Sequence, residues 1–206
     1  VVVGDNGAAI FDIVTIDEGL TDSPVDDTKR SVLAQISSIA PSVGGSDTIV
    51  VGNGDDVVIA GVGIDYVNFI NGTNPMPIDT DDIGADVVLG DNGEAAFDTS
   101  TGVSLLTQIM TSDVADGAGD FIFAGNGPDV VLGGSGGDVM DAGLDDDADD
   151  VVLGDNGSAT FDLVDIGDGL TSVLTELAST ATDIGGDDVI IVGDGDRKII
   201  MIPRNQ

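Results

Sequence analysis

An aspartate recurs every nine residues in two stretches of this chain, SDTIVVGNGDDVVIAGVGIDYVN and GDFIFAGNGPDVVLGGSGGDVMD. The members of the two series are Asp47, Asp56 and Asp65, and Asp120, Asp129 and Asp138. An apolar residue stands two positions after each of them, and glycines precede the second and third aspartate of each series at fixed offsets. So short and regular a period predicts a stack of small units that each add one side chain to a thin core.

A longer repeat contains the nine-residue one. Its three copies begin alike, with VVVGDNGAAIFD at 1–12, VVLGDNGEAAFD at 87–98 and VVLGDNGSATFD at 151–162. In the later copies Ala95 and Ala159 replace the aspartate of the nine-residue pattern, whereas Phe97 and Phe161 keep its apolar position. We therefore expect each GDNG segment to be a variant of the nine-residue unit, here called a rung, and the line of aspartates to be interrupted beside it. The chain is predicted to form one elongated domain of three units, 1–86, 87–150 and 151–206.

An amphipathic segment follows each GDNG copy. The three segments are SVLAQISSI at 31–39, SLLTQIM at 104–110 and SVLTELA at 172–178. Their apolar residues recur at helical spacing, and each begins with a serine that could cap a helix. We expect three short helices that cover the stacked repeat; a groove for a partner is the less favoured interpretation.

The charge of the chain limits its partners. Asp and Glu number 39 against 5 Lys and Arg, which gives a formal net charge of −34. A folded body with this charge repels itself, and its aspartate-rich glycine loops offer the oxygen ligands that Ca²⁺ prefers. The same charge argues against a nucleic-acid partner. The alternative is that the loop aspartates are simply solvated on a metal-free stack.

Missing residue types exclude several kinds of chemistry. The chain has no His and no Cys, which removes zinc, haem and iron–sulfur ligation as well as catalysis by a cysteine or histidine. No run approaches the roughly 20 apolar residues that span a bilayer. Because the chain begins without Met, it is expected to be part of a longer protein.

The segment GGSGGDVMD at 133–141 resembles the nonapeptide of the RTX (repeat-in-toxin, haemolysin-type) calcium-binding family, Gly-Gly-x-Gly-x-Asp-x-U-x, where U is a large apolar residue. AGNGPDVVL, VGNGDDVVI and AGVGIDYVN match all but its first glycine. The resemblance implies an all-β fold: a parallel β-roll, or β-solenoid, with two nonapeptides per coil. It also implies that several Ca²⁺ ions lie between loops that are stacked eighteen residues apart.

Carried onto this sequence, the resemblance implies that Asp47 faces Asp65 and that Asp120 faces Asp138. Asp56 would pair with Asp86, and Asp129 with Asp150. The implied calcium-ligating aspartates are Asp47, Asp56, Asp65, Asp86, Asp120, Asp129, Asp138, Asp150 and Asp188. The loop residues implied to supply tight turns and carbonyl ligands are Gly52, Asn53, Gly54, Gly61, Gly63, Gly125, Asn126, Gly127, Gly134 and Gly136.

Other positions depart from the pattern. Further candidate ligands are Asp5, Asp91, Asp155 and Asp194, although aspartates of this kind also serve as turn formers. Most of the run at 145–150 is expected to be a solvated loop. Arg197 stands where the last rung should carry its aspartate, so the array is expected to end there. The tail at 199–203 is either a closing strand or an exposed subunit contact.

The sequence favours a non-enzymatic, calcium-stabilised structural module of an extracellular or cell-surface protein, such as an adhesin, a surface layer or a filament subunit. The alternative is the calcium-binding part of a secreted protease or lipase whose catalytic domain lies outside this chain. A third hypothesis is homotypic assembly, end to end or lateral, because an open stack presents unpaired strand edges. The sequence specifies no adhesion target.

Overall fold

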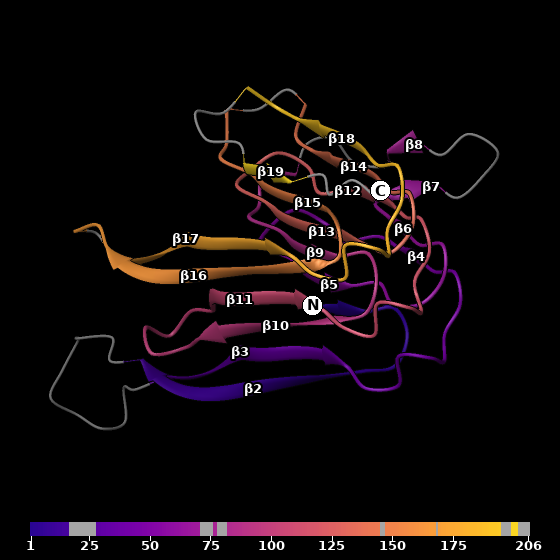
Figure 1. Ribbon diagram of the computed structural model, residues 1–206. Helices are drawn as coiled ribbons and strands as arrows, with labels where there is room; N and C mark the ends of the chain where they lie inside the picture. The colour runs from indigo at the N-terminus through magenta and orange to yellow at the C-terminus, as the bar shows by residue number, and fades with distance from the viewer. Residues whose placement is uncertain are drawn as a thin grey trace, which may run out of the picture.

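The computed structural model describes residues 1–16, 28–70, 76–77, 82–144, 147–167, 169–194 and 199–201. Every regular element in these residues is a β-strand (Figure 1). The strands form two parallel sheets, one antiparallel sheet and a two-stranded hairpin. In the described part of the chain, none of the segments is a helix that could cross a membrane.

Three sheets make up the body of the protein. Parallel sheet 1 has the order β1 (Val2–Val3), β5 (Val57–Ile59), β9 (Val87–Leu89), β13 (Val130–Gly134), β15 (Val151–Asp155) and β19 (Ile199–Met201). Parallel sheet 2 has the order β4 (Thr48–Ile49), β6 (Tyr66–Val67), β12 (Phe121–Phe123), β14 (Val139–Ala142) and β18 (Val189–Val192). The antiparallel sheet has the order β2 (Gly7–Ile16), β3 (Thr28–Ser38), β10 (Gly93–Asp98), β11 (Leu105–Thr111), β16 (Gly157–Asp165) and β17 (Leu170–Ser179). The hairpin consists of β7 (Phe69–Ile70) and β8 (Met76–Pro77).

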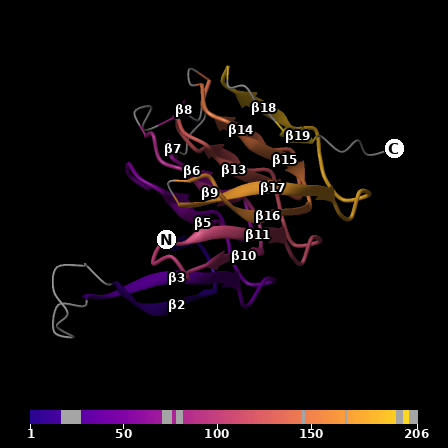
Figure 2. The same ribbon diagram turned by 90° about the vertical axis from the view of Figure 1, so that its left-hand side faces the viewer.

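Each GDNG unit passes through the sheets in the same order. The second unit, for example, places β9 in sheet 1, the hairpin β10–β11 in the antiparallel sheet, and then β12, β13 and β14 alternately in sheets 2 and 1. In every sheet the strands therefore follow chain order, and Figure 2 shows this as a single progression of colour across the stack. The repeat seen in the sequence is a repeat along one stacking direction.

Parallel sheet 1 is the middle layer and is buried on both faces. The central valines of its strands, such as Val88 and Val131, belong to the core that it shares with sheet 2. The flanking residues, such as Leu89 and Leu132, belong to the core that it shares with the antiparallel sheet. This double burial explains why the strands read VVI or VVL without polar alternation.

The three segments predicted as helices are strands. They are β3, β11 and β17, and each pairs with the strand before it in a hairpin. In each hairpin the register shifts by one residue, so that in β11 Thr107 is an extra residue between Leu106 and Gln108. This β-bulge brings Leu106 and Ile109, three residues apart, to the same buried face. A spacing of three is also helical, which is why the sequence pattern was misleading.

The prediction of a plain parallel β-roll is therefore wrong, because the protein combines parallel and antiparallel sheets. The GDNG rung does not continue the parallel stack; its chain leaves sheet 1 and enters a hairpin. Ala95 and Ala159 are fully buried between sheet 1 and the antiparallel sheet, where a carboxylate would have no solvent. Phe161 is also buried there, whereas Phe11, on the edge strand β2, is exposed.

Residues 199–201 add a strand to sheet 1. β19 pairs in parallel with β15 and is the edge strand of this sheet in the described residues, which leaves a subunit contact at this edge a prediction. Arg197 and the residues after 201 lie outside the described residues.

Gly157 tests the packing of the GDNG corner. A Cβ at this position would collide with the carbonyl oxygen of Ala178 and the side chain of Leu153. We expect Gly157→Ala to lower the free energy of unfolding by about 2 kcal/mol, a typical result of overpacking. Gly52→Ala is the matched control, because nothing lies within 4 Å of its Cβ position. Urea denaturation measures both, and equal effects would contradict this account of the corner.

Candidate metal centre

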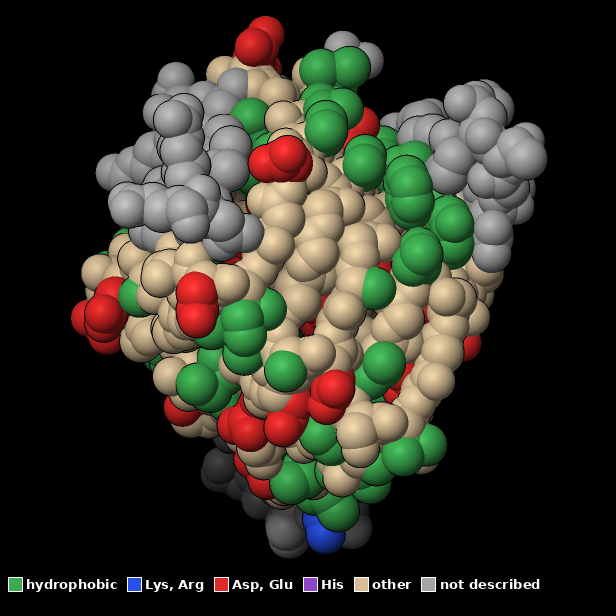
Figure 3. All heavy atoms as spheres, turned by 45° about the vertical axis from the view of Figure 1, so that its right-hand side comes forward, with side chains coloured by type: hydrophobic (Ala, Val, Ile, Leu, Met, Phe, Trp, Pro, Cys, Tyr) green, Lys and Arg blue, Asp and Glu red, His purple; other side chains and the backbone are tan. Residues whose placement is uncertain are grey.

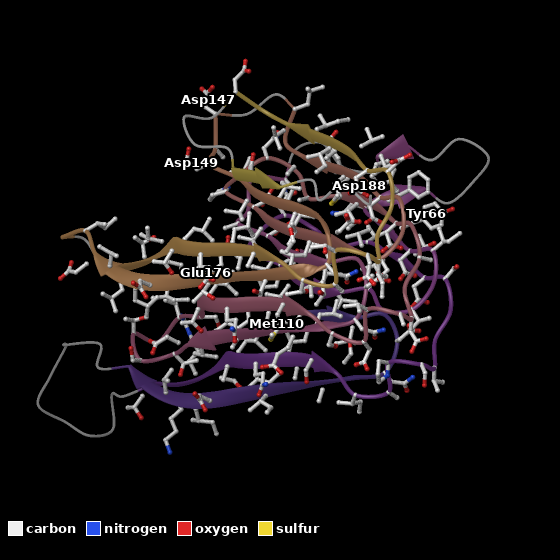
Figure 4. The ribbon with its side chains drawn as sticks, in the orientation of Figure 1. Tyr66, Met110, Asp147, Asp149, Glu176 and Asp188 are labelled. Carbon is white, nitrogen blue, oxygen red and sulfur yellow. The ribbon has the colours of Figure 1, made fainter. Side chains whose placement is uncertain are left out.

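Two rows of aspartates run along the stack. Row 1 consists of residues that directly precede the strands of sheet 2: Asp47, Asp65, Asp120, Asp138 and Asp188. Row 2 consists of residues that directly precede strands of sheet 1: Asp56, Asp86, Asp129 and Asp150. Figure 4 places Asp188 of row 1 and Asp149, the neighbour of Asp150, on opposite sides of the parallel sheets. The two rows therefore lie at opposite edges of the stack.

Within each row, the backbone N–H of one aspartate donates to the carboxylate of the next. In row 1 the amide nitrogen of Asp47 lies 2.6 Å from Oδ1 of Asp65, and that of Asp120 lies 2.8 Å from Oδ1 of Asp138. In row 2 the corresponding distances are 2.9 Å from Asp56 to Asp86, 2.8 Å from Asp86 to Asp129 and 3.2 Å from Asp129 to Asp150. The four pairs expected from the nonapeptide are thus neighbours, while their role as ligands stays a prediction.

Row 1 also continues across the GDNG units, where an interruption was expected. The amide of Asp65 lies 2.8 Å from Oδ1 of Asp120, although 55 residues separate them in the chain. The amide of Asp138 lies 3.0 Å from Oδ1 of Asp188. The expected gap is absent because each GDNG hairpin leaves the stack, so that the row 1 aspartates before and after it in the chain become neighbours.

The second carboxylate oxygen has no such partner. In row 1, Asp65, Asp120 and Asp138 are fully buried, and in the described structure Oδ2 of each accepts no hydrogen bond. Oδ2 of Asp86 in row 2 is in the same situation. A buried oxygen of this kind is costly when the carboxylate is ionised, unless a proton or a cation satisfies it.

Burial and mutual repulsion raise the pKa values of these carboxyl groups. Burial raises the pKa of Asp120 to about 10, and the charges of Asp91 and Asp138 add to the shift. Burial also raises the pKa of Asp138 to about 8, and those of Asp65 and Asp86 to about 7. Without a cation, row 1 is therefore partly protonated at neutral pH.

The glycine loops beside the rows have the expected turns. The glycines with φ between 104° and 127° are Gly54, Gly61, Gly63, Gly125, Gly127, Gly134 and Gly136. Gly52 is not among the residues with positive φ, and Asn53 beside it is exposed. Asn126 donates its backbone N–H to the carbonyl oxygen of Asp82 at 2.7 Å. These left-handed conformations are open to glycine at little cost, which explains the glycine content of the loops.

The GDNG aspartates tie loops together. Asp5 accepts N–H groups from Gly45 at 3.2 Å and from Val62 at 2.6 Å. In the next unit Asp91 accepts the equivalent N–H groups, from Ala118 and Ser135. These contacts show that Asp5 and Asp91 hold neighbouring loops together. Asp91 also lies close enough to row 1 for its charge to raise the pKa of Asp120.

The third GDNG aspartate is only partly satisfied. Oδ1 of Asp155 accepts the N–H of Gly186 at 2.9 Å, whereas its Oδ2 is buried with no hydrogen-bond partner in the described residues. Asp155 thus resembles the row aspartates more than Asp5 does. Asp194 is exposed, and the structure does not bring it into either row.

The first glycine of GDNG is explained by row 1. A Cβ on Gly90 would collide with Oδ2 of Asp120, and one on Gly154 would collide with Oδ2 of Asp188. The carboxylates of row 1 therefore lie directly against these glycines. On the face seen in Figure 3, acidic side chains (red) are scattered among backbone and uncharged polar atoms (tan), and a basic side chain (blue) is visible at the lower edge.

Asp82 is a residue that the nine-residue pattern missed. Its Oδ1 accepts N–H groups from Gly54 at 3.2 Å and from Gly84 at 3.0 Å. Asp82 stands four residues before Asp86, where the nonapeptide has its second glycine. Asp91 occupies the same place in GDNG, so an aspartate at the second-glycine position was the available signal.

The shifted carboxyl groups make stability depend on pH. Asp65, Asp86 and Asp138 have a folded-state pKa above the ordinary value of 3.8, so the folded protein holds their protons more tightly than the unfolded chain. Stability present below pH 3.8 is lost as the pH rises through about 7 to 8. Metal-free protein should therefore be more stable at pH 5 than at pH 8, by at least about 2 kcal/mol, since one pKa unit corresponds to about 1.4 kcal/mol.

Urea denaturation of protein stripped of metal, at the two pH values, measures this difference. Equal stability at both values, or greater stability at pH 8, would show that the row carboxylates are not buried as described.

Comparison with protein-family models, with curated proteins and with solved structures found no match for this chain.

Proposed function

We propose that this protein is a calcium-binding module in which Ca²⁺ ions along the aspartate rows hold the stacked loops together. The observation that carries the proposal is the set of buried Oδ2 atoms without hydrogen-bond partners at Asp65, Asp86, Asp120 and Asp138. Each of these carboxylates is already fixed in orientation through its Oδ1, so Oδ2 is left buried without a hydrogen-bond partner. The resemblance to the RTX nonapeptide supports the same function.

The donor set favours Ca²⁺ over other metals. Carboxylate and backbone carbonyl oxygens are the only strong ligand types in these loops, because the chain has no His and no Cys. Ca²⁺ takes six to eight oxygens in flexible geometry, whereas Mg²⁺ demands a near-ideal octahedron and keeps several waters. Loops that stack closely and bury their carboxylates suit the ion that gives up its water more readily.

Calcium dependence of the fold suggests where the protein works. Sites of this kind in extracellular modules have dissociation constants on the order of 10⁻⁴–10⁻³ M, and bound ions stabilise the folded state by mass action. We infer an extracellular or cell-surface structural module, as part of an adhesin, a surface layer or a filament. The alternative, the calcium-binding portion of a secreted protease or lipase, is distinguished by an HExxH or GxSxG motif elsewhere in the parent protein.

A calcium titration tests the central proposal. We expect millimolar Ca²⁺ to raise the thermal midpoint of metal-free protein at pH 8 and to strengthen its β circular-dichroism signal, and EGTA to reverse both changes. Mg²⁺ at the same concentration should have a much smaller effect. A spectrum and a midpoint that do not respond to Ca²⁺ would overturn the proposal.

Asp120→Asn separates calcium binding from ordinary packing. The asparagine keeps an Oδ1 for the N–H of Asp65 but is neutral, so that folding at pH 8 no longer has to bury a charge or take up a proton at this position. Without metal at pH 8 the variant should be more stable than the wild type, and Ca²⁺ should stabilise it less. Asp162→Asn is the control, because this side chain on β16 is exposed and belongs to neither row, so it should change neither value. A purely structural Asp120 would instead give a variant that is destabilised with and without Ca²⁺.

A second candidate function is homotypic assembly, favoured by the apolar edge of the antiparallel sheet. β2 is an edge strand, and its Ile10, Phe11 and Ile13 have exposed fractions of 53%, 48% and 73%. An exposed apolar edge strand is a template for pairing with another chain. We propose that a second copy covers β2 in a calcium-dependent assembly.

Sedimentation velocity in millimolar Ca²⁺ tests this assembly. The wild type should form larger species as its concentration rises, and Ile13→Lys should remain monomeric. Thr15→Lys is the control, since it adds the same charge at an exposed polar position on the same strand. A wild type that is monomeric at every concentration would exclude assembly through β2.

A further inference from the structure

A third carboxylate joins row 2 at one place only in the described part of the chain. Asp56, Asp82 and Asp86 each offer a carboxylate oxygen, and these oxygens all lie within 4.8 Å of one another. The first and last are row 2 members, whereas Asp82 comes from the second-glycine position of the loop before Asp86. Elsewhere in row 2 this position holds glycine in the described loops, namely Gly52 and Gly125.

Two carboxylates of this group are fixed by backbone hydrogen bonds to one oxygen, and the other oxygen of each has no hydrogen-bond partner in the described residues. Asp82 and Asp86 are 2% and 1% exposed, and Oδ2 of each accepts no hydrogen bond in the described structure. Their Oδ1 atoms are occupied by backbone N–H groups: Asp82 holds those of Gly54 and Gly84, and Asp86 holds that of Asp56. The Oδ1 contacts fix the two carboxylates, and the buried Oδ2 atoms remain for a cation.

Local charge points the same way. In the described part of the chain, no Lys or Arg side chain forms a salt bridge with these three carboxylates. The three carboxylates therefore have no basic side chain beside them in the described residues to offset their charge.

We propose that Asp56, Asp82 and Asp86 form a three-carboxylate site that binds one Ca²⁺ ion more tightly than the sites with two row aspartates. The proposal rests on the calcium-binding function proposed above. Oxygens about 2.4 Å from a calcium ion lie at most about 4.8 Å apart, so three carboxylate oxygens that are all within 4.8 Å of one another can share one ion. Affinity for Ca²⁺ rises with the number of charged ligands, so the third carboxylate strengthens this site.

The position of the site suggests what the ion does. Asp56 and Asp86 are neighbours in row 2 but are 30 residues apart in the chain, whereas Asp47 and Asp65 in row 1 are separated by 18. The additional residues include the hairpin β7–β8, after which the chain returns to the stack at Asp82. An ion held by all three carboxylates would connect the returning chain, at Asp82 and Asp86, to the preceding row 2 loop at Asp56.

Calcium binding by Asp82→Asn tests the inference. The asparagine retains an Oδ1 for the N–H groups of Gly54 and Gly84 but removes the charge. By calorimetry on metal-free protein, we expect the variant to bind one ion fewer at low Ca²⁺, or to bind its tightest ion at least about tenfold more weakly, since loss of a mere outer-shell partner already costs about 10- to 100-fold. Asp116→Asn is the matched control, because Asp116 occupies the second-glycine position of a row 1 loop but is exposed.

The outcomes separate this site from the general function. If the wild type binds no Ca²⁺, the proposed function and this site both fail. If the wild type and Asp82→Asn bind equally many ions with equal affinity, the three-carboxylate site is overturned and the function of the rows stands. If the variant does not fold, anomalous diffraction from wild-type crystals with lanthanum decides: a peak among the three carboxylates supports the site, and occupied rows without that peak overturn it.

Discussion

The hydrogen bond from the backbone N–H of one row aspartate to the carboxylate of the next is the interaction on which the stack depends. It sets the spacing of the loops, and it fixes each carboxylate so that Oδ1 is used and Oδ2 is buried. The same hydrogen bond that orders the loops thus leaves buried carboxylate oxygens without a partner, which a bound cation would satisfy. A neutral residue such as Asn would supply the acceptor without the charge, and the use of aspartate instead supports the proposed metal binding.

The GDNG corner allows this stack to carry a third layer. Its first glycine makes room for a row 1 carboxylate, its aspartate holds the loops beside it, and its second glycine lets the chain turn into a hairpin. The hairpins cover the outer face of sheet 1, which would otherwise expose Leu89, Leu132 and their equivalents. The long repeat therefore supplies the cover for the core, and the nine-residue repeat supplies the rows.

The sequence predicted the structure most accurately in the nine-residue repeats. The resemblance to the RTX nonapeptide implied that Asp47 neighbours Asp65 and that Asp120 neighbours Asp138, and the loop glycines other than Gly52 predicted the left-handed turns. The prediction failed in the segment around Leu106 and Ile109, because a β-bulge gives a strand the apolar spacing of a helix. The β-roll was wrong for a related reason: Ala95 looked like a lost ligand, whereas it is a small core residue where the chain leaves the stack. The nine-residue pattern did not predict a role for Asp82, because the segment with β7 and β8 separates it in the chain from Gly54, one of its two hydrogen-bond donors.

Row 1 also has a direction. Each member accepts a hydrogen bond from the previous one and donates to the next, so in the described residues the row begins with the carboxylate of Asp47 and ends with the amide of Asp188. Two rows that met end to end in opposite orientations would bring two carboxylates or two amides together. The stack is therefore polar in the way that a filament is polar, and a further unit, from the same chain or another, can extend the row in only one orientation.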